Sequence, residues 1–414
     1  MPSLSRTQWT ILAVAWLGWV FDVMDTALFN FAKAPMLIEM LGAVRYKLVG
    51  PRIEGQIQTW FLVGWAIGGL IFGILADRWG RTRTLVVTIL MYCALTGLTA
   101  FCRSPEQVMV TRFLTALGIG GEWAAGAALV AESLPDGFRA KASSLLQSAA
   151  ALGPVFAALA NFGLAEHSWR ALFLVGVLPA LMCVVIRTHI PEPQGPASSA
   201  PTKGALSMLN ELFSDPTLRR NVSVAIVIGV VGVTGAGIVP FWIPNLVREA
   251  SLGLSEAAIR TRTSNATLAI HVGTLLGVFA FPWLAVRIGR KRAFALFFVL
   301  SPCTAAVALF GGSSYLRLLM LLPIATFFSI GVSAGFALYF PELFPTRLRA
   351  TGSGLAYNAG RIFSAPFPWL IGAAIGAFNG SVAAGVLIAG FVYVLGLLAL
   401  PFAPETSGVP LPRD

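Results

Sequence analysis

The sequence predicts an all-α membrane protein with twelve transmembrane helices in two pseudo-symmetric six-helix halves. Composition, apolar windows and an internal repeat predict it. Of the 414 residues, 57% are hydrophobic and 11% charged, whereas soluble domains carry roughly twice that charged fraction. The basic excess, a formal charge of +11, lies in short clusters between apolar runs, which is typical of loops facing an anionic membrane leaflet. We therefore expect a lipid bilayer, and no nucleic acid, among its partners.

Apolar windows of about 20 residues, the length that crosses a bilayer, recur along the whole chain. The loop after the first window, with Lys33, Arg45, Lys47 and Arg52, is expected on the external side of the membrane. Loops on the side of the N-terminus hold more Lys and Arg, so we expect a multi-pass protein of the cell membrane with both termini cytoplasmic. The twelve windows are 9–31, 56–76, 84–102, 106–131, 142–163, 169–188, 221–246, 263–286, 293–311, 316–340, 350–376 and 381–402.

A repeat at an offset of 209 to 210 residues divides the chain. Two similar bundles that rock about a midplane site are typical of carriers. We predict an N-terminal six-helix bundle at 1–190, a Pro/Ser/Gly-rich cytoplasmic linker at 191–218 and a C-terminal bundle with a short cytoplasmic tail at 219–414. The repeat matches LADRWGRTR (75–83) with LAVRIGRKR (284–292), AESLPDGFRA (131–140) with PELFPTRLRA (341–350), and Gly64 and Gly68 with Gly273 and Gly277.

These motifs resemble a known family. GWAIGGLIFGILADRWGRTR (64–83) is similar to the loop between helices 2 and 3 of the major facilitator superfamily, and LAVRIGRKR, where Val286 replaces the aspartate, is similar to its degenerate second copy. The resemblance implies the major facilitator fold and transport by alternating access. Within the superfamily, the chain most resembles the metabolite:proton symporters, especially the sialate, lactate and aromatic-acid carriers. The segments that carry this resemblance are residues 6–29, 112–135, 169–180 and 357–361 and the tail PETSGVPLP.

Ionisable residues inside predicted spans mark the candidate site, because each costs about 2.5 to 3.5 kcal/mol to insert. Asp22 and Asp25 share a face of the first span. Asp25 lies about 24 Å from the inner edge of a roughly 30 Å core, and Arg112 lies about 9 Å below the outer edge. Because these depths are similar, we predict an Asp25–Arg112 ion pair from which protonation of Asp25 releases the arginine. The alternative is a static pair that only fixes packing.

Further polar residues extend the predicted site. Glu122 lies about 15 Å along the helix from Arg112 and is either a second proton acceptor or a structural partner of helix 1 or 5. The resemblance implies a proton-coupling role for the helix 1 aspartate and the helix 4 arginine. Arg361 lies near the midplane on a face with Tyr357 and Asn358, which favours a carboxylate ligand. Its alternative role is to neutralise a buried acid. Pro366 and Pro368 are expected to break this helix.

A cytoplasmic gate is predicted where the loop motif meets the membrane surface. A carboxylate there can meet a helix N-terminus or an arginine and hold that side shut. The alternative is a set of plain positive-inside anchors, which we prefer for Arg83, Arg290, Lys291 and Arg292. The predicted gating residues are Asp77, Arg78, Arg81, Glu132 and Arg139.

The sequence thus predicts a secondary active transporter that carries a small organic anion, a carboxylate, together with a proton. In this scheme Asp25, with Asp22 or Glu122, takes the proton, and Arg112 and Arg361 meet the anion. A uniporter or exchanger of a neutral solute such as a sugar is the alternative, and a non-transport membrane sensor is the third. The motifs of hydrolases, metalloproteases and P-loop ATPases are absent from the sequence, so we expect no enzyme, no cofactor and no metal. We expect a monomer.

Overall fold

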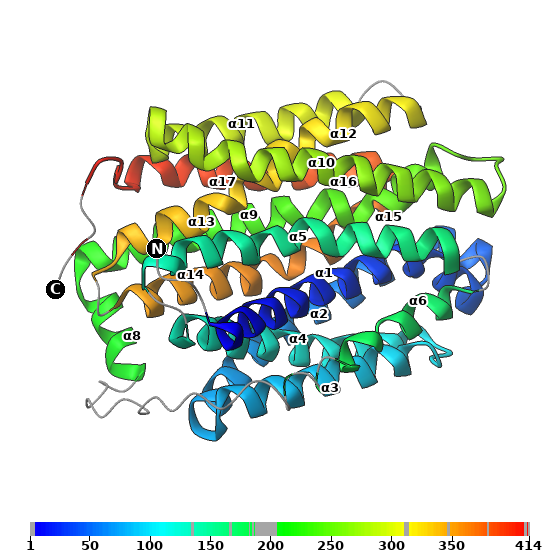
Figure 1. The fold of residues 1–414 in the computed structure, drawn as a ribbon. Coiled ribbons are helices and arrows are strands. Elements are labelled where there is room, and N and C mark those ends of the chain that lie inside the picture. The colour runs from blue at the N-terminus through cyan, green and yellow to red at the C-terminus, as the bar shows by residue number, and fades with distance from the viewer. Residues whose placement is uncertain are drawn as a thin grey trace. The chain divides into compact units, whose positions relative to one another are not determined.

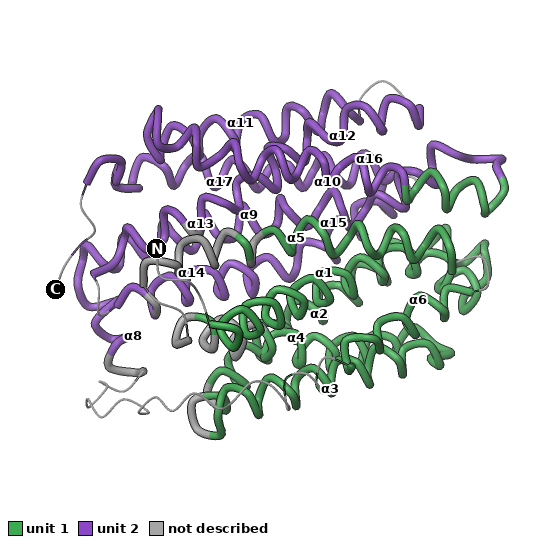
Figure 2. The backbone as a smooth tube through the Cα atoms, viewed as in Figure 1, with its two compact units in different colours: residues 1–199, 255–264 green, residues 200–254, 265–414 purple. Residues whose placement is uncertain are grey.

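The computed structural model describes residues 5–133, 136–164, 168–181, 183, 186, 205–309, 314–345, 348–378, 381–409 and 412. Every regular element in this part of the chain is a helix (Figure 1). The chain forms two compact units, residues 1–199 with 255–264 and residues 200–254 with 265–414 (Figure 2). The predicted domain boundaries at 190 and 218 remain a proposal.

Unit 1 is built from six helices of the described N-terminal part. The first, α1, begins at a capping box in which Ser5 and Gln8 bond each other's backbone N–H groups. In the core of unit 1, α4 packs against α2 and α3, and α5 packs against α1. The bounds are α1 (Arg6–Leu41), α2 (Ala43–Trp79), α3 (Arg81–Thr99), α4 (Pro105–Ser133), α5 (Asp136–Leu164) and α6 (Trp169–Val175), followed by the 3-10 turn η1 (Leu178–Leu181).

Unit 2 contains the remaining helices, except that residues 255–264 at the start of α10 group with unit 1. Several of its helices are interrupted by short breaks. One break lies within residues 350–376, where Pro366 and Pro368 predicted it. The bounds are α8 (Ala205–Ser214), α9 (Pro216–Glu249), α10 (Glu256–Ile288), α11 (Arg290–Leu309), α12 (Tyr315–Ser329), η2 (Gly331–Ser333), α13 (Ala334–Tyr339), η3 (Phe340–Leu343), α14 (Arg349–Ser364), α15 (Pro366–Ala377), α16 (Val382–Ala389), α17 (Val392–Ala399) and η5 (Leu400–Phe402).

The all-helical membrane architecture is confirmed. As far as its residues are described, each predicted window falls on one helix or on consecutive helical segments. Eight helices in the described residues are long and apolar enough to cross a membrane. The predicted first external loop is wrong, because α1 continues to Leu41 and α2 begins at Ala43, with only Gly42 between them. Part of the predicted linker is also helical, since it contains α8.

The repeat predicted from sequence recurs as the same packing in each unit. A Cβ atom at Gly68 would collide with the backbone of Leu117 in α4, and one at Gly277 would collide with the backbone of Phe327 in α12. Only glycine permits this approach of two helix backbones. The matched pair Gly80 and Gly289 also has positive φ angles, 110° and 95°. The two units therefore share local geometry as well as sequence.

Candidate functional site

The predicted ion pair is present in the core of unit 1. Nη1 of Arg112 lies 2.7 Å from Oδ2 of Asp25, and the arginine side chain is wholly buried. The other carboxylate oxygen, Oδ1, accepts a hydrogen bond of 2.8 Å from the hydroxyl of Thr96 in α3. Three helices thus meet at Asp25, because α1 carries the carboxylate, α3 the hydroxyl and α4 the arginine.

Two aromatic rings hold the Arg112 guanidinium. Its carbon lies 4.5 Å from the ring centroid of Phe61 and 5.0 Å from that of Phe29. Only Nη1 is used by Asp25; Nε and Nη2 are buried and have no hydrogen-bond partner among the described residues. Nε and Nη2 form one edge of the guanidinium plane, the edge that binds a carboxylate through two parallel hydrogen bonds. Such buried donors are costly unless a ligand or water meets them.

Asp22 and Glu122 are also buried in unit 1, near Tyr92. Glu122 lies close enough to Asp22 and Tyr92 to interact with them electrostatically. One of its carboxylate oxygens lies against Gly18 of α1, where any Cβ atom would collide with it. Glu122 therefore packs against helix 1, one of the two structural partners that the sequence left open. Two neighbouring buried carboxyl groups can share a proton, so this contact leaves a proton role open as well.

A second buried ion pair in unit 1 escaped the sequence reasoning. Nζ of Lys33 lies 3.2 Å from Oε2 of Glu54, and neither side chain is exposed. The Tyr46 hydroxyl donates to Oε1 of Glu54 at 2.7 Å. Lys33 had been placed in an external loop because the first apolar window was ended at residue 31. A signal was present, since Asp25, Phe29 and Lys33 follow the helical spacing of four residues.

In unit 2, Arg361 and Tyr357 lie together on α14, as predicted. Nη2 of Arg361 donates to the Tyr357 hydroxyl at 3.0 Å, and the guanidinium carbon lies 4.3 Å from the centre of the same ring. Arg361 is 6% exposed. Asn358 donates to the Gly354 carbonyl of its own helix, so its amide nitrogen is occupied locally. Ser364, at the end of the same helix, accepts a hydrogen bond of 2.9 Å from the Thr234 hydroxyl of α9.

Most predicted gating side chains lie outside the described residues. The backbones of Asp77 and Arg78 belong to α2, that of Glu132 to α4 and that of Arg139 to α5, but their side chains are not described. Arg81 is the first residue of α3. The structure therefore does not bring these five residues together or separate them.

The matching positions in unit 2 are described, and they correct the view of Arg290 as a plain anchor. Arg290 is 8% exposed, and its Nε and Nη2 donate to the two carboxylate oxygens of Glu342 at 3.2 and 3.0 Å. The Thr406 hydroxyl donates to Glu342 at 2.5 Å. A largely buried, bidentate pair of this kind ties the start of α11 to η3, whereas a membrane-surface anchor would be exposed to solvent.

Glu405 of the C-terminal tail extends this network. Its carboxylate accepts hydrogen bonds from the backbone N–H groups of Arg290 and Lys291 at 2.9 and 3.1 Å, at the N-terminus of α11. Burial alone raises the pKa of Glu405, but these donors and the N–H groups of Thr406 and Ser407 outweigh it, and the pKa lies below its ordinary value. The tail is therefore anchored by an ionised carboxylate.

Among the described residues there is no cluster of His, Cys, Asp or Glu side chains suited to a metal ion. His271, the one histidine within a predicted span of unit 2, bonds the Thr267 carbonyl of its own helix through Nδ1 at 2.7 Å.

Comparison with known proteins identifies the family. The family model described as Major Facilitator Superfamily matches residues 15–368. The cis,cis-muconate transport protein of Acinetobacter baylyi is 30% identical, over 97% of this chain and 95% of its own length. The sialic acid transporter NanX of Escherichia coli is 29% identical, over 84% of this chain and 82% of its own length.

Solved structures agree on the fold. The crystal structure of a D-xylose-proton symporter superposes with a TM-score of 0.77 at 19% identity, covering 97% of this chain and 99% of that one.

The names of the relatives are those of transporters, which confirms that the chain is a multi-pass membrane transporter rather than an enzyme. The resemblance drawn from the loop motifs is confirmed: this chain belongs to the major facilitator superfamily.

Proposed function

We propose that the chain is a secondary active transporter of the cell membrane that carries a small organic anion, a carboxylate, together with a proton by alternating access. The observation that carries the anion assignment is the Nε–Nη2 edge of Arg112, which is buried and without a hydrogen-bond partner among the described residues. A carboxylate satisfies both donors at once. Muconate and sialic acid, named for two relatives, are both organic acids.

The proton assignment rests on the opposite edge of the same guanidinium. Oδ2 of Asp25 lies 2.7 Å from Nη1 of Arg112. A carboxylate at Nε and Nη2 shares the positive charge that otherwise stabilises ionised Asp25, so substrate binding favours protonation of Asp25. Protonation in turn weakens the ion pair and strengthens the interaction of Arg112 with the substrate. Asp22 and Glu122 supply neighbouring carboxyl groups to which a proton can pass.

Further roles complete the proposal. Arg361, with Tyr357 and Asn358 on α14, is a second anion-binding group. At the cytoplasmic side, Asp77, Arg78, Arg81, Glu132 and Arg139 form the gate. The repeat counterparts of Arg81 and Glu132, which are Arg290 and Glu342, form an ion pair in unit 2. The transporter is a monomer with both termini in the cytoplasm.

Uptake into proteoliposomes under an imposed inward proton gradient tests the substrate class. The uptake of labelled mono- and dicarboxylates and of neutral sugars is measured with the wild-type protein and with Arg112→Lys. Lysine keeps the charge but loses the planar fork, so we expect the KM for the transported acid to rise at least tenfold, that is, by about 1.4 kcal/mol of binding free energy or more.

Arg170→Lys is the matched control, because Arg170 also pairs with a carboxylate of unit 1, Glu39, at 2.8 Å, but its side chain is 37% exposed. Its KM should stay that of the wild type. Accumulation of a sugar without any carboxylate would contradict the anion assignment and favour the neutral-solute carrier.

A further inference from the structure

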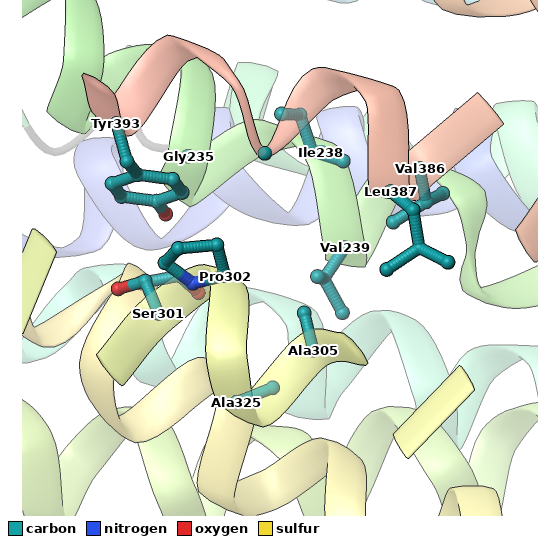
Figure 3. Close-up of a pocket in the computed structure, with 12 residues that line it drawn as sticks. Gly235, Ile238, Val239, Ser301, Pro302, Ala305, Ala325, Val386, Leu387 and Tyr393 are labelled. Atoms are coloured by element: carbon teal, nitrogen blue, oxygen red, sulfur yellow. The ribbon is translucent and has the colours of Figure 1, made fainter. Parts of the chain in front are cut away.

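Unit 2 contains a small cavity among α9, α11, α12, α16 and α17 (Figure 3). Its volume of about 30 Å3 leaves room for one or two water molecules, whereas small-molecule sites in proteins measure about 300 Å3 or more. The Tyr393 hydroxyl on its wall interacts with the hydroxyl groups of Ser301 and Ser329. This cavity is therefore too small for an organic ligand.

Thr96 of α3 is a wholly buried polar residue beside the proposed proton site of unit 1. Its hydroxyl donates to Oδ1 of Asp25 at 2.8 Å. A buried threonine in a helix commonly donates to a carbonyl of its own helix, as Thr88 of α3 does at 3.0 Å. A hydroxyl group has a single hydrogen to donate, and Thr96 uses it for the carboxylate.

Gly176 fixes the direction of the Thr96 side chain. It follows the last residue of α6, and a Cβ atom there would collide with the methyl carbon of Thr96. The φ and ψ angles of Gly176, −64° and −5°, are open to any residue, so the backbone conformation does not require glycine. The space at Gly176 accommodates the methyl group of Thr96, and this leaves the hydroxyl directed at Asp25.

The two oxygens of the Asp25 carboxylate therefore differ in their partners. Oδ1 accepts the Thr96 hydrogen bond, and Oδ2 lies 2.7 Å from Nη1 of Arg112. A proton on Oδ1 would force the Thr96 hydrogen away from its acceptor, whereas a proton on Oδ2 leaves that bond intact. A carboxyl oxygen that carries a proton is a poor acceptor, so a proton on Oδ2 releases Nη1.

Asp25 has ionisable neighbours on three helices, namely Arg112 of α4, Tyr92 and Cys93 of α3 and Asp22 of α1 itself. The described side chains of α5, residues 145 and 148–164, include no ionisable group. Arg112 and the Thr96 hydroxyl therefore stabilise ionised Asp25, whereas the nearby acid Asp22 opposes it. Further charged groups on helices packed against α1 contact other residues, since Glu122 lies against Gly18, Glu54 pairs with Lys33 and Arg170 pairs with Glu39.

We propose that Thr96 is a positioning residue for proton coupling, an inference that rests on the proposed symport function. Its hydroxyl holds Oδ1 of Asp25, so the proton binds at Oδ2, where it displaces Nη1 of Arg112. Without this hydroxyl, the proton can bind at Oδ1 while the ion pair stays intact. Proton binding then no longer frees the arginine for the substrate.

Thr96→Val tests this role, because valine keeps the branched shape and loses the donor. A lost hydrogen bond to the ionised carboxylate favours its protonation. The pH at which carboxylate uptake into proteoliposomes is half-maximal should therefore rise by about one unit. Accumulation driven by an inward proton gradient should fall, whereas counterflow exchange, which needs only substrate binding and alternating access, should continue.

Two comparisons separate this role from a structural one. Thr96→Ser keeps the hydroxyl and should have the pH profile of the wild type. Thr88→Val is the matched control, because Thr88 is wholly buried in the same helix but its hydroxyl bonds the carbonyls of Thr84 and Leu85. Its pH profile should also stay that of the wild type.

Gly176→Ala is a second test that leaves the Thr96 hydroxyl in the protein. The added methyl group collides with that of Thr96 and turns the side chain, so the pH profile should move in the same direction as in Thr96→Val. The double variant Gly176→Ala with Thr96→Ser has no such collision and should return toward the wild type. This pair keeps the test decisive if Thr96→Val does not fold.

The outcomes distinguish this inference from the proposed function. If the wild type accumulates the acid under the gradient, but Thr96→Val and Gly176→Ala keep its pH profile, the role of Thr96 is overturned and symport stands. Wild-type uptake that ignores the gradient overturns both.

Discussion

Lys33 and Glu54 form an ion pair of 3.2 Å in the core of unit 1, with neither side chain exposed. The pair joins α1 to α2 at the end opposite the loop motif. Both charges have left water, so their mutual attraction and the Tyr46 hydrogen bond must compensate a large desolvation cost. The two residues therefore depend on each other, which a pair of substitutions can measure.

Lys33→Met should destabilise the protein by about 3 to 5 kcal/mol, because it leaves the Glu54 carboxylate buried without its counter-charge. The double variant Lys33→Met with Glu54→Leu should recover most of this loss. Denaturant unfolding of the purified protein in detergent measures both. Arg170→Met is the control, since it breaks the exposed Glu39–Arg170 pair and should cost no more than about 1 kcal/mol. If Lys33→Met and Arg170→Met lowered the free energy of unfolding by equal amounts, the account would be contradicted.

The contact between Gly277 and the backbone of Phe327 predicts a second effect on stability. Gly277→Ala forces α10 away from α12 and should destabilise the protein by about 1 to 3 kcal/mol. Gly237→Ala is the matched control, because Gly237 lies in α9 and a Cβ atom added there would have no neighbouring atom within 4 Å. Alanine there should stabilise the helix by up to about 1 kcal/mol. The same sign for both substitutions in thermal unfolding would count against the packing described.

The tail carboxylate predicts a pH dependence at the start of α11. The pKa of Glu405 is lowered, so its contribution to stability is fully present above the ordinary value of about 4.3 and is lost as pH falls through the lower, folded value. Amide hydrogen exchange at Arg290 and Lys291, whose N–H groups bond this carboxylate, should rise below about pH 4 after correction for the intrinsic rate.

Two comparisons control this measurement. The Ala293 amide bonds the Gly289 carbonyl in the same helix and should keep its protection longer as the pH falls. Glu405→Gln should raise exchange at Lys291 already at neutral pH and remove the acid-induced step. A step that persists in Glu405→Gln would assign it to another group.

Most of the fold was accessible from the sequence because membrane helices must be long, apolar and internally hydrogen-bonded. The repeat was equally informative, since Gly68 with Gly277 and Gly80 with Gly289 are glycines for reasons of backbone geometry that both halves share. The predicted end of the first span was wrong because a window chosen by hydropathy alone ends where a charged residue occurs. Lys33 lies buried inside α1, where Glu54, 21 residues along the chain, neutralises its charge.

The candidate site was predicted in part. Depth along a straight helix is a simple function of residue number, and it correctly paired Asp25 with Arg112. It could not identify Thr96 as the second partner of Asp25, or Phe29 and Phe61 as the rings around Arg112, because those contacts depend on how helices rotate and pack. The role of Arg290 was misjudged for the same reason, since its partner Glu342 lies 52 residues away.

Proton coupling through Asp25 is the central claim, and Asp25→Asn tests it most directly. Asparagine keeps the shape of the side chain but takes up no proton. In proteoliposomes loaded with a transported carboxylate, we predict that Asp25→Asn abolishes accumulation driven by an inward proton gradient and retains counterflow exchange, which needs only substrate binding and alternating access. Accumulation by Asp25→Asn at the wild-type level, or wild-type uptake that ignores the gradient, would contradict the account and leave the Asp25–Arg112 pair with a structural role.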